Sequence, residues 1–319
     1  MQNIIYGLSN ETYHRGEDYR EYLSSTQLKW YLKSPRHFRH MLDHPEDETD
    51  AMRFGSLFHD CLAALAEGCS LSEVLSAIAV FEPPVNDRAG QPYGATTKAY
   101  KKSLEAFSAE HDDAFISSAA EKDTISQMLN SMLCGCGATS KKIQEILRRG
   151  KPEASIFVEY EGCKFKLRPD LLVRYKQRGD NCADIYDWKS VTTDDLSAEN
   201  INRIILRYAY HISSSFYQFF YHELTGIWPR FILVLASKAA PFDCVMVDMA
   251  NYGYRYQPLY DMVVPGPGAV EFKRLLDLHL ECTATNNYPG AEMFSADNKC
   301  RILEIDPPKY YSNKFIEDY

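Results

Sequence analysis

Hydrophobic and polar residues alternate along the second half of the chain in a way that predicts a group of β-strands. Residues 155–160 form an apolar, β-branched run, and residues 163–167 alternate between polar and apolar. Glu161-Gly162 lies between the two runs and is a turn signal, so the pair predicts a β-hairpin. The hairpin leads through Arg168-Pro169-Asp170 into the apolar residues 171–173, and further strands are expected at 183–191, 230–237 and 243–248.

Helical patterns dominate the first half. We expect helices at residues 55–66, 71–79, 97–109, 119–133 and 141–149, with a Pro- and Gly-containing loop at 82–94. Ser24-Ser25 is a good N-cap signal and predicts a short helix after it. One long helix is expected at about 198–224, where Ile212, Phe216 and Phe219 or Phe220 have the spacing of a buried stripe. A final helix at 270–286 completes an α/β pattern.

Two acids and a lysine fall on neighbouring strands of this pattern. Pro169 lacks a ladder donor, so it predicts a bend that aims Asp170 out of the sheet. Asp187 and Lys189 are two residues apart on the next strand and therefore point to the same face. Two carboxylates beside a lysine suit a hard divalent cation and a water that the lysine orients, which is the equipment for cleaving a phosphodiester. A surface salt bridge between strands is the alternative explanation.

The charge balance limits the kinds of nucleic-acid binding that are open to the chain. The 319 residues include 35 basic and 44 acidic side chains, for a net charge of −9. This argues against a protein that coats nucleic acid by bulk charge, but it leaves room for an enzyme with a local basic surface. Basic clusters lie at residues 29–40 and 141–151, and Arg203 and Arg207 share one face of a predicted helix. A solvated helix face is the alternative for each cluster.

Other features favour a cytoplasmic protein without a membrane partner. No apolar run has the length of a transmembrane helix, and the N-terminus lacks a basic region followed by an apolar stretch. The nine cysteines are an odd number without framework spacing, which predicts free thiols in a reducing compartment.

The acidic strand motif is part of a wider pattern. Asp170 followed by Asp187-x-Lys189, with Glu153 upstream, resembles the PD-(D/E)XK nuclease superfamily. Further motifs resemble its RecE-type exonuclease (exonuclease VIII) branch: Leu23 to Lys29 with Ser34 to Phe38, Met52 to His59, Tyr208 to Tyr217 with Gly226, and Tyr288-Pro289-Gly290. The likeness extends over roughly residues 20–295, and the order and spacing of the motifs are more specific than any one of them.

The resemblance implies a fold and a division of labour along the chain. The fold is α/β, with a central mixed β-sheet nuclease core that is flanked by helices and carries an N-terminal helical elaboration. Residues 1–150 then form a mainly helical part that contributes to a DNA channel, residues 151–295 form the nuclease core, and residues 296–319 form a C-terminal tail.

The resemblance also implies a role for each site residue. The implied cofactor is Mg²⁺, with Mn²⁺ as a substitute, and both ions are hard cations that bind oxygen ligands. The residues implied at the metal are the side chains of Glu153, Asp170, Asp187 and His59 and the backbone carbonyl of Trp188. Lys189 positions the attacking water or helps to deprotonate it, and Tyr217 contacts the DNA or the scissile phosphate.

One position departs from the family pattern. The helix of the family carries a glutamine four residues before the tyrosine, whereas this chain has Ser213 four residues before Tyr217. A serine hydroxyl donates a hydrogen bond but has a shorter reach than an amide. Gln218 lies next to Tyr217, so a shifted version of the motif is the second interpretation. Ser213, Tyr217 and Gln218, together with Arg203 and Arg207, are therefore the predicted DNA-binding residues.

Three functions remain compatible with these residues. The first is a magnesium-dependent exodeoxyribonuclease that digests linear double-stranded DNA from its ends and supplies single strands for recombination. The resemblance implies 5′ to 3′ polarity, a ring-shaped homo-oligomer, a phage or prophage setting and a single-strand annealing recombinase as partner. The second is a nuclease-fold module with weak or no catalysis that binds DNA ends or protein, which Ser213 favours. The third is a PD-(D/E)XK endonuclease with the same site.

Overall fold

The computed structural model describes residues 3–45, 49–86, 90–111, 114–257 and 259–290. The chain forms two compact units. The larger unit comprises Met1–Thr26 and Asp47–Arg274, and the smaller comprises Gln27–Glu46 and Leu275–Tyr319. The functional division at residues 150 and 295 stays a prediction, and the predicted tail at 296–319 lies outside the described residues.

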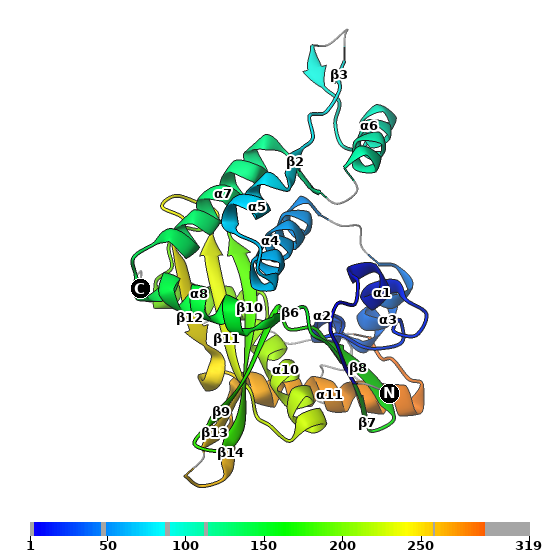
Figure 1. Cartoon of the computed structure of the whole chain (residues 1–319). Coiled ribbons are helices and arrows are strands. Elements are labelled where there is room, and N and C mark those ends of the chain that lie inside the picture. The colour runs from blue at the N-terminus through cyan, green and yellow to red at the C-terminus, as the bar shows by residue number, and fades with distance from the viewer. Residues whose placement is uncertain (1–2, 46–48, 87–89, 112–113, 258, 291–319) are drawn as a thin grey trace, which may run out of the picture. The chain divides into compact units, whose positions relative to one another are not determined.

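A five-stranded mixed sheet forms the centre of the larger unit (Figure 1). Its strands follow the order β12-β11-β10-β9-β6. The pair β10–β11 is parallel, whereas β9–β10, β11–β12 and β6–β9 are antiparallel. This confirms the α/β fold with a central mixed sheet. The strands are β6 (Lys151–Pro152), β9 (Leu171–Gln177), β10 (Asp180–Val191), β11 (Arg230–Ser237) and β12 (Cys244–Asp248).

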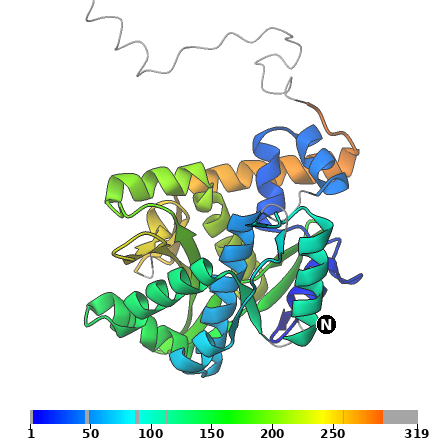
Figure 2. The same ribbon diagram turned by 90° about the horizontal axis from the view of Figure 1, so that it is seen from above.

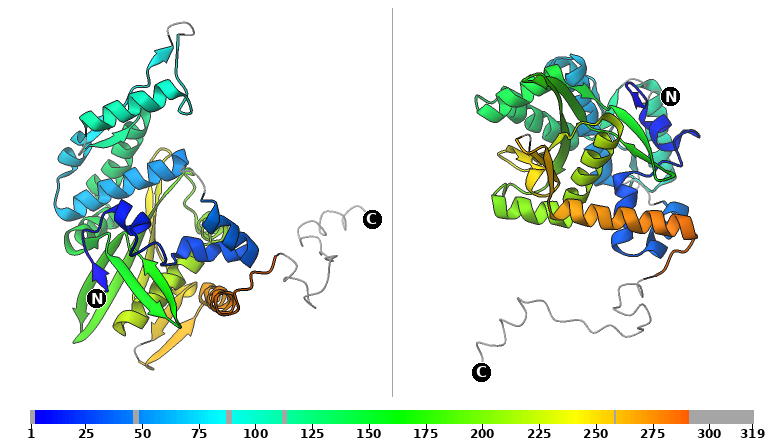
Figure 3. Two further views of the ribbon diagram at one scale, coloured as in Figure 1. Left: turned by 90° about the vertical axis from the view of Figure 1, so that its right-hand side faces the viewer. Right: turned by 90° about the horizontal axis from the view of Figure 1, so that it is seen from below.

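The predicted hairpin lies in a second sheet with the order β1-β7-β8. Its strands are β1 (Ile4–Ile5), β7 (Ser155–Tyr160) and β8 (Cys163–Leu167). Both turn residues have positive φ, 49° at Glu161 and 77° at Gly162, as a two-residue hairpin turn requires. The left view of Figure 3 shows the N-terminal segment beside this hairpin. Because β8 and β9 belong to different sheets, Arg168-Pro169-Asp170 is the bend that joins them.

Helices cover both faces of the central sheet. On one face, Tyr186, Trp188 and Val234 join a single apolar core with α4 (Asp50–Glu67), α5 (Leu71–Ser76), α7 (Ala119–Cys134) and α8 (Ala138–Arg149). This helical layer is seen from above in Figure 2. On the opposite face, α10 (Tyr210–Thr225) lies against β11, with Tyr217 edge-on to Phe231 at 5.7 Å between ring centres. The alternation of strand side chains assigns neighbouring residues to the two faces.

Two predicted helices differ from the structure. The helix expected at 198–224 is two helices, α9 (Ala198–Arg207) and α10, which are separated at Tyr208 and Ala209. Ala209 has φ 52° and ψ 41°, a left-handed conformation that a continuous helix does not contain. The helix expected at 71–79 ends at Ser76, because Ile78–Val80 form strand β2 beside β5 (Phe115–Ser117). Burial of Ile78 between neighbouring elements outweighs its helical periodicity.

The remaining elements of the larger unit are short or peripheral. Near the N-terminus lie α1 (Asn10–Arg15) and the start of α2 (Ser25–Lys29). The predicted loop at 82–94 contains β3 (Val85–Asn86) and β4 (Gln91–Pro92), and α6 (Lys98–Glu110) follows. After β12 come η2 (Met249–Asn251), β13 (Tyr254–Gln257), β14 (Met262–Pro265) and the start of α11 (Pro267–Thr285). Across the described residues, no helix combines the length and apolar character needed to cross a membrane.

The smaller unit contains η1 (Trp30–Leu32), α3 (Pro35–Asp43) and the second part of α11. The ring of Tyr31 stacks on Phe38 with 4.3 Å between ring centres. The hydroxyl of Tyr31 is hydrogen-bonded to Nδ1 of His279 at 3.1 Å. These buried aromatic contacts join the two segments of the unit, which are far apart in sequence.

A buried lysine holds the N-terminal segment on β8. Lys166 is 4% exposed, and its Nζ donates to the carbonyl oxygens of Tyr13 at 2.8 Å and Tyr19 at 3.0 Å. Burial, and secondarily the charge of Arg168, lower the pKa of Lys166 from 10.5 to about 8. This contact fixes α1 beside the strands that carry the candidate site.

We expect the substitution Lys166→Met to reveal this buried charge through the pH dependence of stability. Below about pH 8 the lysine is protonated in the folded and the unfolded chain, whereas between about 8 and 10.5 only the unfolded chain keeps the proton. Stability of the wild type therefore rises with pH in that window. Relative to Lys166→Met, its free energy of unfolding in urea should rise by about 2 kcal/mol between about pH 7 and about pH 10.

Lys164→Met is the matched control, because Lys164 lies on the same strand but is exposed and paired with Glu21. Its stability difference from the wild type should show no such rise. A constant difference between wild type and Lys166→Met across the window would show that Lys166 keeps an ordinary pKa.

Candidate active site

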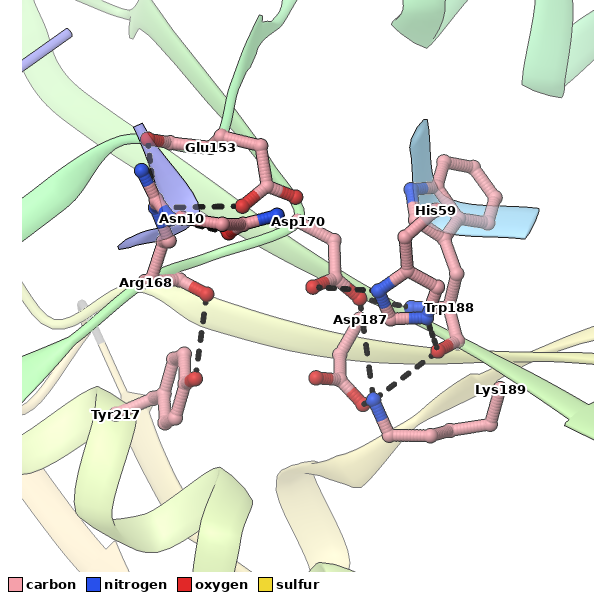
Figure 4. Close-up of polar contacts among 9 residues, drawn as sticks. All are labelled: Asn10, His59, Glu153, Arg168, Asp170, Asp187, Trp188, Lys189 and Tyr217. Atoms are coloured by element: carbon pink, nitrogen blue, oxygen red, sulfur yellow. Dashed lines mark hydrogen bonds and ion pairs between the residues drawn. The ribbon is translucent and has the colours of Figure 1, made fainter. Parts of the chain in front are cut away.

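Four elements bring the predicted metal-site residues together. Asp170 lies at the bend between β8 and β9, which belong to different sheets. Glu153 lies between β6 and β7, and its N–H donates to the carbonyl oxygen of Asp170 at 3.3 Å. Asp187 and Lys189 share one face of β10, and His59 comes from α4. Figure 4 shows these side chains converging.

Asp170 is held by the neighbouring strand and by the helix. Its Oδ2 accepts a hydrogen bond from the backbone N–H of Trp188 at 2.6 Å, and its Oδ1 lies 3.4 Å from Nδ1 of His59. Nε2 of His59 is 2.7 Å from the carbonyl oxygen of Trp188. The backbone N–H of Trp188 therefore contacts the carboxylate and its carbonyl oxygen contacts the imidazole, so both side chains are fixed relative to β10 (Figure 4).

Lys189 lies between the two aspartates. Its Nζ is 2.7 Å from Oδ2 of Asp187 and 3.9 Å from Oδ2 of Asp170, and it also donates to the carbonyl oxygen of Trp188 at 3.0 Å. Burial lowers the pKa of Lys189, but the charges of Asp187 and Asp170 outweigh this and raise the pKa above its ordinary value. The side chain is therefore an ammonium group at neutral pH.

The two aspartates differ in pKa although they are neighbours. Burial raises the pKa of Asp187, and the charge of Lys189 offsets this only in part. Burial also acts to raise the pKa of Asp170, but His59, Lys189 and the N–H of Trp188 together hold that pKa below its ordinary value. For His59, burial acts to lower the pKa, and the charge of Asp170 outweighs it, so the pKa is raised.

Glu153 occupies a strained position beside Asp170. Its φ of 49° is in the left-handed region, which costs a non-glycine residue about 1–2 kcal/mol. Burial and the charge of Asp170 raise the pKa of Glu153 to about 7. Nε of the buried Arg168 lies 3.3 Å from Oε2 of Glu153 and also donates to its carbonyl oxygen. Strain of this kind persists where surrounding contacts fix the backbone, as Arg168 does here.

The donor set fits a hard divalent cation. One ligand atom from each of His59, Glu153 and Asp170 lies within 4.8 Å of the others. Lys189 contacts Asp187, the carbonyl oxygen of Trp188 and Asp170, so it links the first two to this group. Carboxylate and carbonyl oxygens suit Mg²⁺ and Mn²⁺, whereas an imidazole is a ligand that transition metals favour. A bound cation would also offset the repulsion between buried carboxylates.

The cluster lies in a pocket of about 1100 Å³ within the larger unit. Its wall combines acidic, basic and aromatic side chains. Besides His59, Glu153, Asp170, Asp187 and Lys189, the lining includes Asn10, Tyr13, Arg168, Arg207, Tyr208, Tyr210, Tyr217 and Lys238. An acidic floor with basic and aromatic walls suits a polyanion bound across a cation site.

The predicted DNA-binding residues separate into two groups. Tyr217 and Arg207 line the pocket, and the hydroxyl of Tyr217 donates to the carbonyl oxygen of Arg168 at 3.2 Å. The lining does not include Ser213, Gln218 or Arg203.

Gln218 and Arg203 have structural partners instead. The buried amide of Gln218 donates to the carbonyl oxygens of Pro229 and Tyr254, and its Oε1 accepts from the N–H of Tyr254. Arg203 is exposed and pairs with Glu199. The DNA contacts predicted for Ser213, Gln218 and Arg203 stay predictions that their placement does not support.

Several lining residues were not assigned a role from the sequence. Arg168 binds Glu153, Oδ1 of Asn10 at 2.6 Å and the carbonyl oxygen of Leu8, so it joins the N-terminal segment to the site. An arginine directly before the Pro-Asp bend was a usable signal for this role. Asn10 offered no local signal, because it is 158 residues from Arg168 in the sequence.

A family described as a PDDEXK-like domain of unknown function (DUF3799) matches residues 93–258, slightly more than half of the chain. The chain belongs to this family. It is therefore a nuclease-fold protein of the PD-(D/E)XK superfamily, as the strand motif predicted. The match includes Glu153, Asp170, Asp187 and Lys189, while His59 lies before it.

A solved structure from Eubacterium rectale, described only provisionally as an exonuclease, is similar to the chain over nearly its whole length. The similarity covers 97% of this chain and 98% of the other, with 15% sequence identity and a TM-score of 0.45. No curated protein matches the chain.

We expect Asp170→Asn and Asp187→Asn each to weaken Mn²⁺ binding. Each substitution keeps the shape of the side chain but replaces a charged oxygen with an amide. Calorimetric titration should show a loss of roughly tenfold or more in affinity, since even residues that only support metal ligands contribute about this much.

Asp184→Asn is the control on the same strand. The carboxylate of Asp184 is buried, but it accepts from Nε and an Nη atom of Arg230 at 2.9 and 2.6 Å, outside the cluster. This variant should lower the melting temperature and leave Mn²⁺ affinity unchanged. Unchanged affinity in both site variants would place the ion elsewhere.

Proposed function

We propose that this protein is a metal-dependent deoxyribonuclease that hydrolyses phosphodiester bonds, with Mg²⁺ as the physiological ion and Mn²⁺ as a substitute. The observation that carries the proposal is the convergence of His59, Glu153 and Asp170 within 4.8 Å, next to a lysine that contacts Asp187 at 2.7 Å. Membership of the PD-(D/E)XK superfamily supports it.

The ligands have separable roles in this proposal. His59, Glu153, Asp170 and Asp187, with the carbonyl oxygen of Trp188, would hold the ion. The bound ion supplies a Lewis acid for the phosphate and lowers the pKa of water. The ammonium group of Lys189 orients the attacking water and stabilises negative charge that develops on the phosphate.

Three features of the chain's own residues prepare the site. Trp188 holds Asp170 through its N–H at 2.6 Å, so this ligand needs no reorganisation when the substrate binds. Arg168 orients Glu153 through the contact at 3.3 Å. Arg207 and Lys238 on the pocket wall attract the DNA backbone toward the acidic floor.

We further propose exonuclease action on linear double-stranded ends, with 5′ to 3′ polarity and single strands as the product for recombination. The support is the order of motifs that resembles the RecE-type branch, from Leu23 to Gly290. A ring-shaped homo-oligomer, a single-strand annealing partner and a cytoplasmic, phage or prophage setting belong to the same proposal. A weakly active DNA-end-binding module is the second candidate, which Ser213 at the family's glutamine position favours.

Linear and closed DNA distinguish the forms of this proposal. Purified protein should release nucleotides from linear duplex DNA in Mg²⁺ or Mn²⁺, should stop when chelator is added, and should leave covalently closed circles intact. Release of acid-soluble nucleotides measures digestion of the linear duplex, and gel analysis shows whether the closed circles remain intact. Asp187→Asn, prepared in parallel, excludes a contaminating nuclease. Circles cut as fast as linear DNA would replace the exonuclease with an endonuclease, and binding without cleavage would favour the module.

Loss of Lys189 should affect chemistry more than DNA binding. Because its ammonium group acts mainly on charge that develops in the transition state, Lys189→Ala should lower kcat by roughly a hundredfold or more at saturating DNA. Kd for the same duplex should change far less. Lys164→Ala removes an exposed lysine that lies outside the pocket lining and should leave kcat unchanged. An unimpaired Lys189→Ala enzyme would refute the assigned mechanism.

A further inference from the structure

The break between α9 and α10 gives two tyrosines an arrangement that a continuous helix cannot provide. Residues two apart on a helix point in nearly opposite directions. Ala209, with φ 52°, reverses the backbone between Tyr208 and Tyr210. Both rings therefore line the same pocket, and they stack with 5.6 Å between ring centres and an interplanar angle of 26°.

These rings connect the cation site to the surface. Nζ of Lys189 lies 5.9 Å from the ring centre of Tyr210, which stacks on Tyr208. The guanidinium of Arg207 lies 5.7 Å from the ring centre of Tyr208. Tyr208 is 50% exposed, whereas burial, as the largest effect, raises the pKa of Tyr210 to about 12. From the buried end of the pocket toward the surface, the order is Lys189, Tyr210, Tyr208 and Arg207.

We propose that Tyr208, supported from below by Tyr210, is a stacking platform for an unpaired nucleobase of the DNA strand that enters the pocket. This inference rests on the proposed function and specifies its substrate as a strand end whose outermost base has left the duplex. The platform lies one ring away from the lysine that acts at the scissile phosphate, so a stacked base fixes the phosphate next to it. Arg207, whose guanidinium lies over the Tyr208 ring in the absence of DNA, moves to the backbone phosphate of the same nucleotide.

Three observations support a base as the ligand. Tyr208 is half-exposed at a polar pocket, and its ring offers stacking without hydrogen-bond readout to a base that takes the place of the Arg207 guanidinium over it, which accepts all four bases. A ring stacked behind it keeps that face in one orientation. The backbone at Ala209 is strained in the left-handed region, and its effect is to place the two rings together.

The test measures binding of a short DNA duplex that ends in one unpaired 2-aminopurine nucleotide, with chelator present so that no bond is cleaved. Stacking quenches the fluorescence of this base, and the titration gives Kd. Tyr208→Leu should abolish the quenching and raise Kd by roughly 5- to 100-fold, the loss expected for one base–aromatic stack. Tyr208→Phe keeps the ring and should remain within about twofold of the wild type.

Two controls separate stacking from a general loss of structure. The same duplex with an abasic end nucleotide should bind wild type and Tyr208→Leu equally, because no base is present to stack. Tyr260→Leu removes a 73% exposed tyrosine between β13 and β14, outside the pocket lining, and should change nothing. Unchanged quenching in Tyr208→Leu, or an equal loss of affinity for abasic DNA, would overturn the platform.

The platform and the proposed function fail in different ways. Wild type that quenches the end base but cleaves no linear duplex in Mg²⁺ would retain the platform and remove the nuclease. Wild type that cleaves linear duplex while Tyr208→Leu binds normally would retain the nuclease and remove the platform.

Discussion

The site depends on one hydrogen bond between strands that belong to different parts of the sequence. The backbone N–H of Trp188 donates to Oδ2 of Asp170 at 2.6 Å, and this bond fixes the bend at Pro169 against the central strand β10. The pairing of β9 with β10 reaches Leu171 opposite Tyr186, and this bond extends the contact to the bend itself. A charge-assisted hydrogen bond to a buried carboxylate is among the stronger interactions available for this purpose.

The surrounding charges form a balanced group. Three carboxylates, an imidazole and an ammonium group lie together with little exposure, and an isolated buried ion costs several kcal/mol. In the absence of a cation, His59 and Lys189 provide positive charge beside Asp170 and Asp187, and Arg168 provides it beside Glu153. Because these groups already bind the carboxylates, the protein holds the ligands near one another before a divalent cation competes for the same oxygens.

The sequence predicted the parts of this arrangement that depend on local pattern. Alternation identified β7 and β8, and positive φ at Glu161 and Gly162 agrees with the predicted turn. Spacing by two placed Asp187 and Lys189 on one face, and their contact at 2.7 Å confirms it.

The features that the sequence did not predict depend on tertiary contacts. The periodicity of residues 198–224 concealed the break at Ala209, because both helices bury apolar faces in the same register. Asn10 and Arg168 meet only in the folded chain.

The distances in sequence between these partners have a consequence for synthesis of the protein. His59 contacts a residue 129 positions later, and Asn10 contacts one 158 positions later. Loops of this length must close before His59 and Asn10 reach their partners, so these two parts of the site assemble late in folding. Chains emerge from the ribosome N-terminus first. A nascent chain that ends before β10 carries neither Asp187 nor Lys189, so the candidate site is incomplete until that strand has been synthesised.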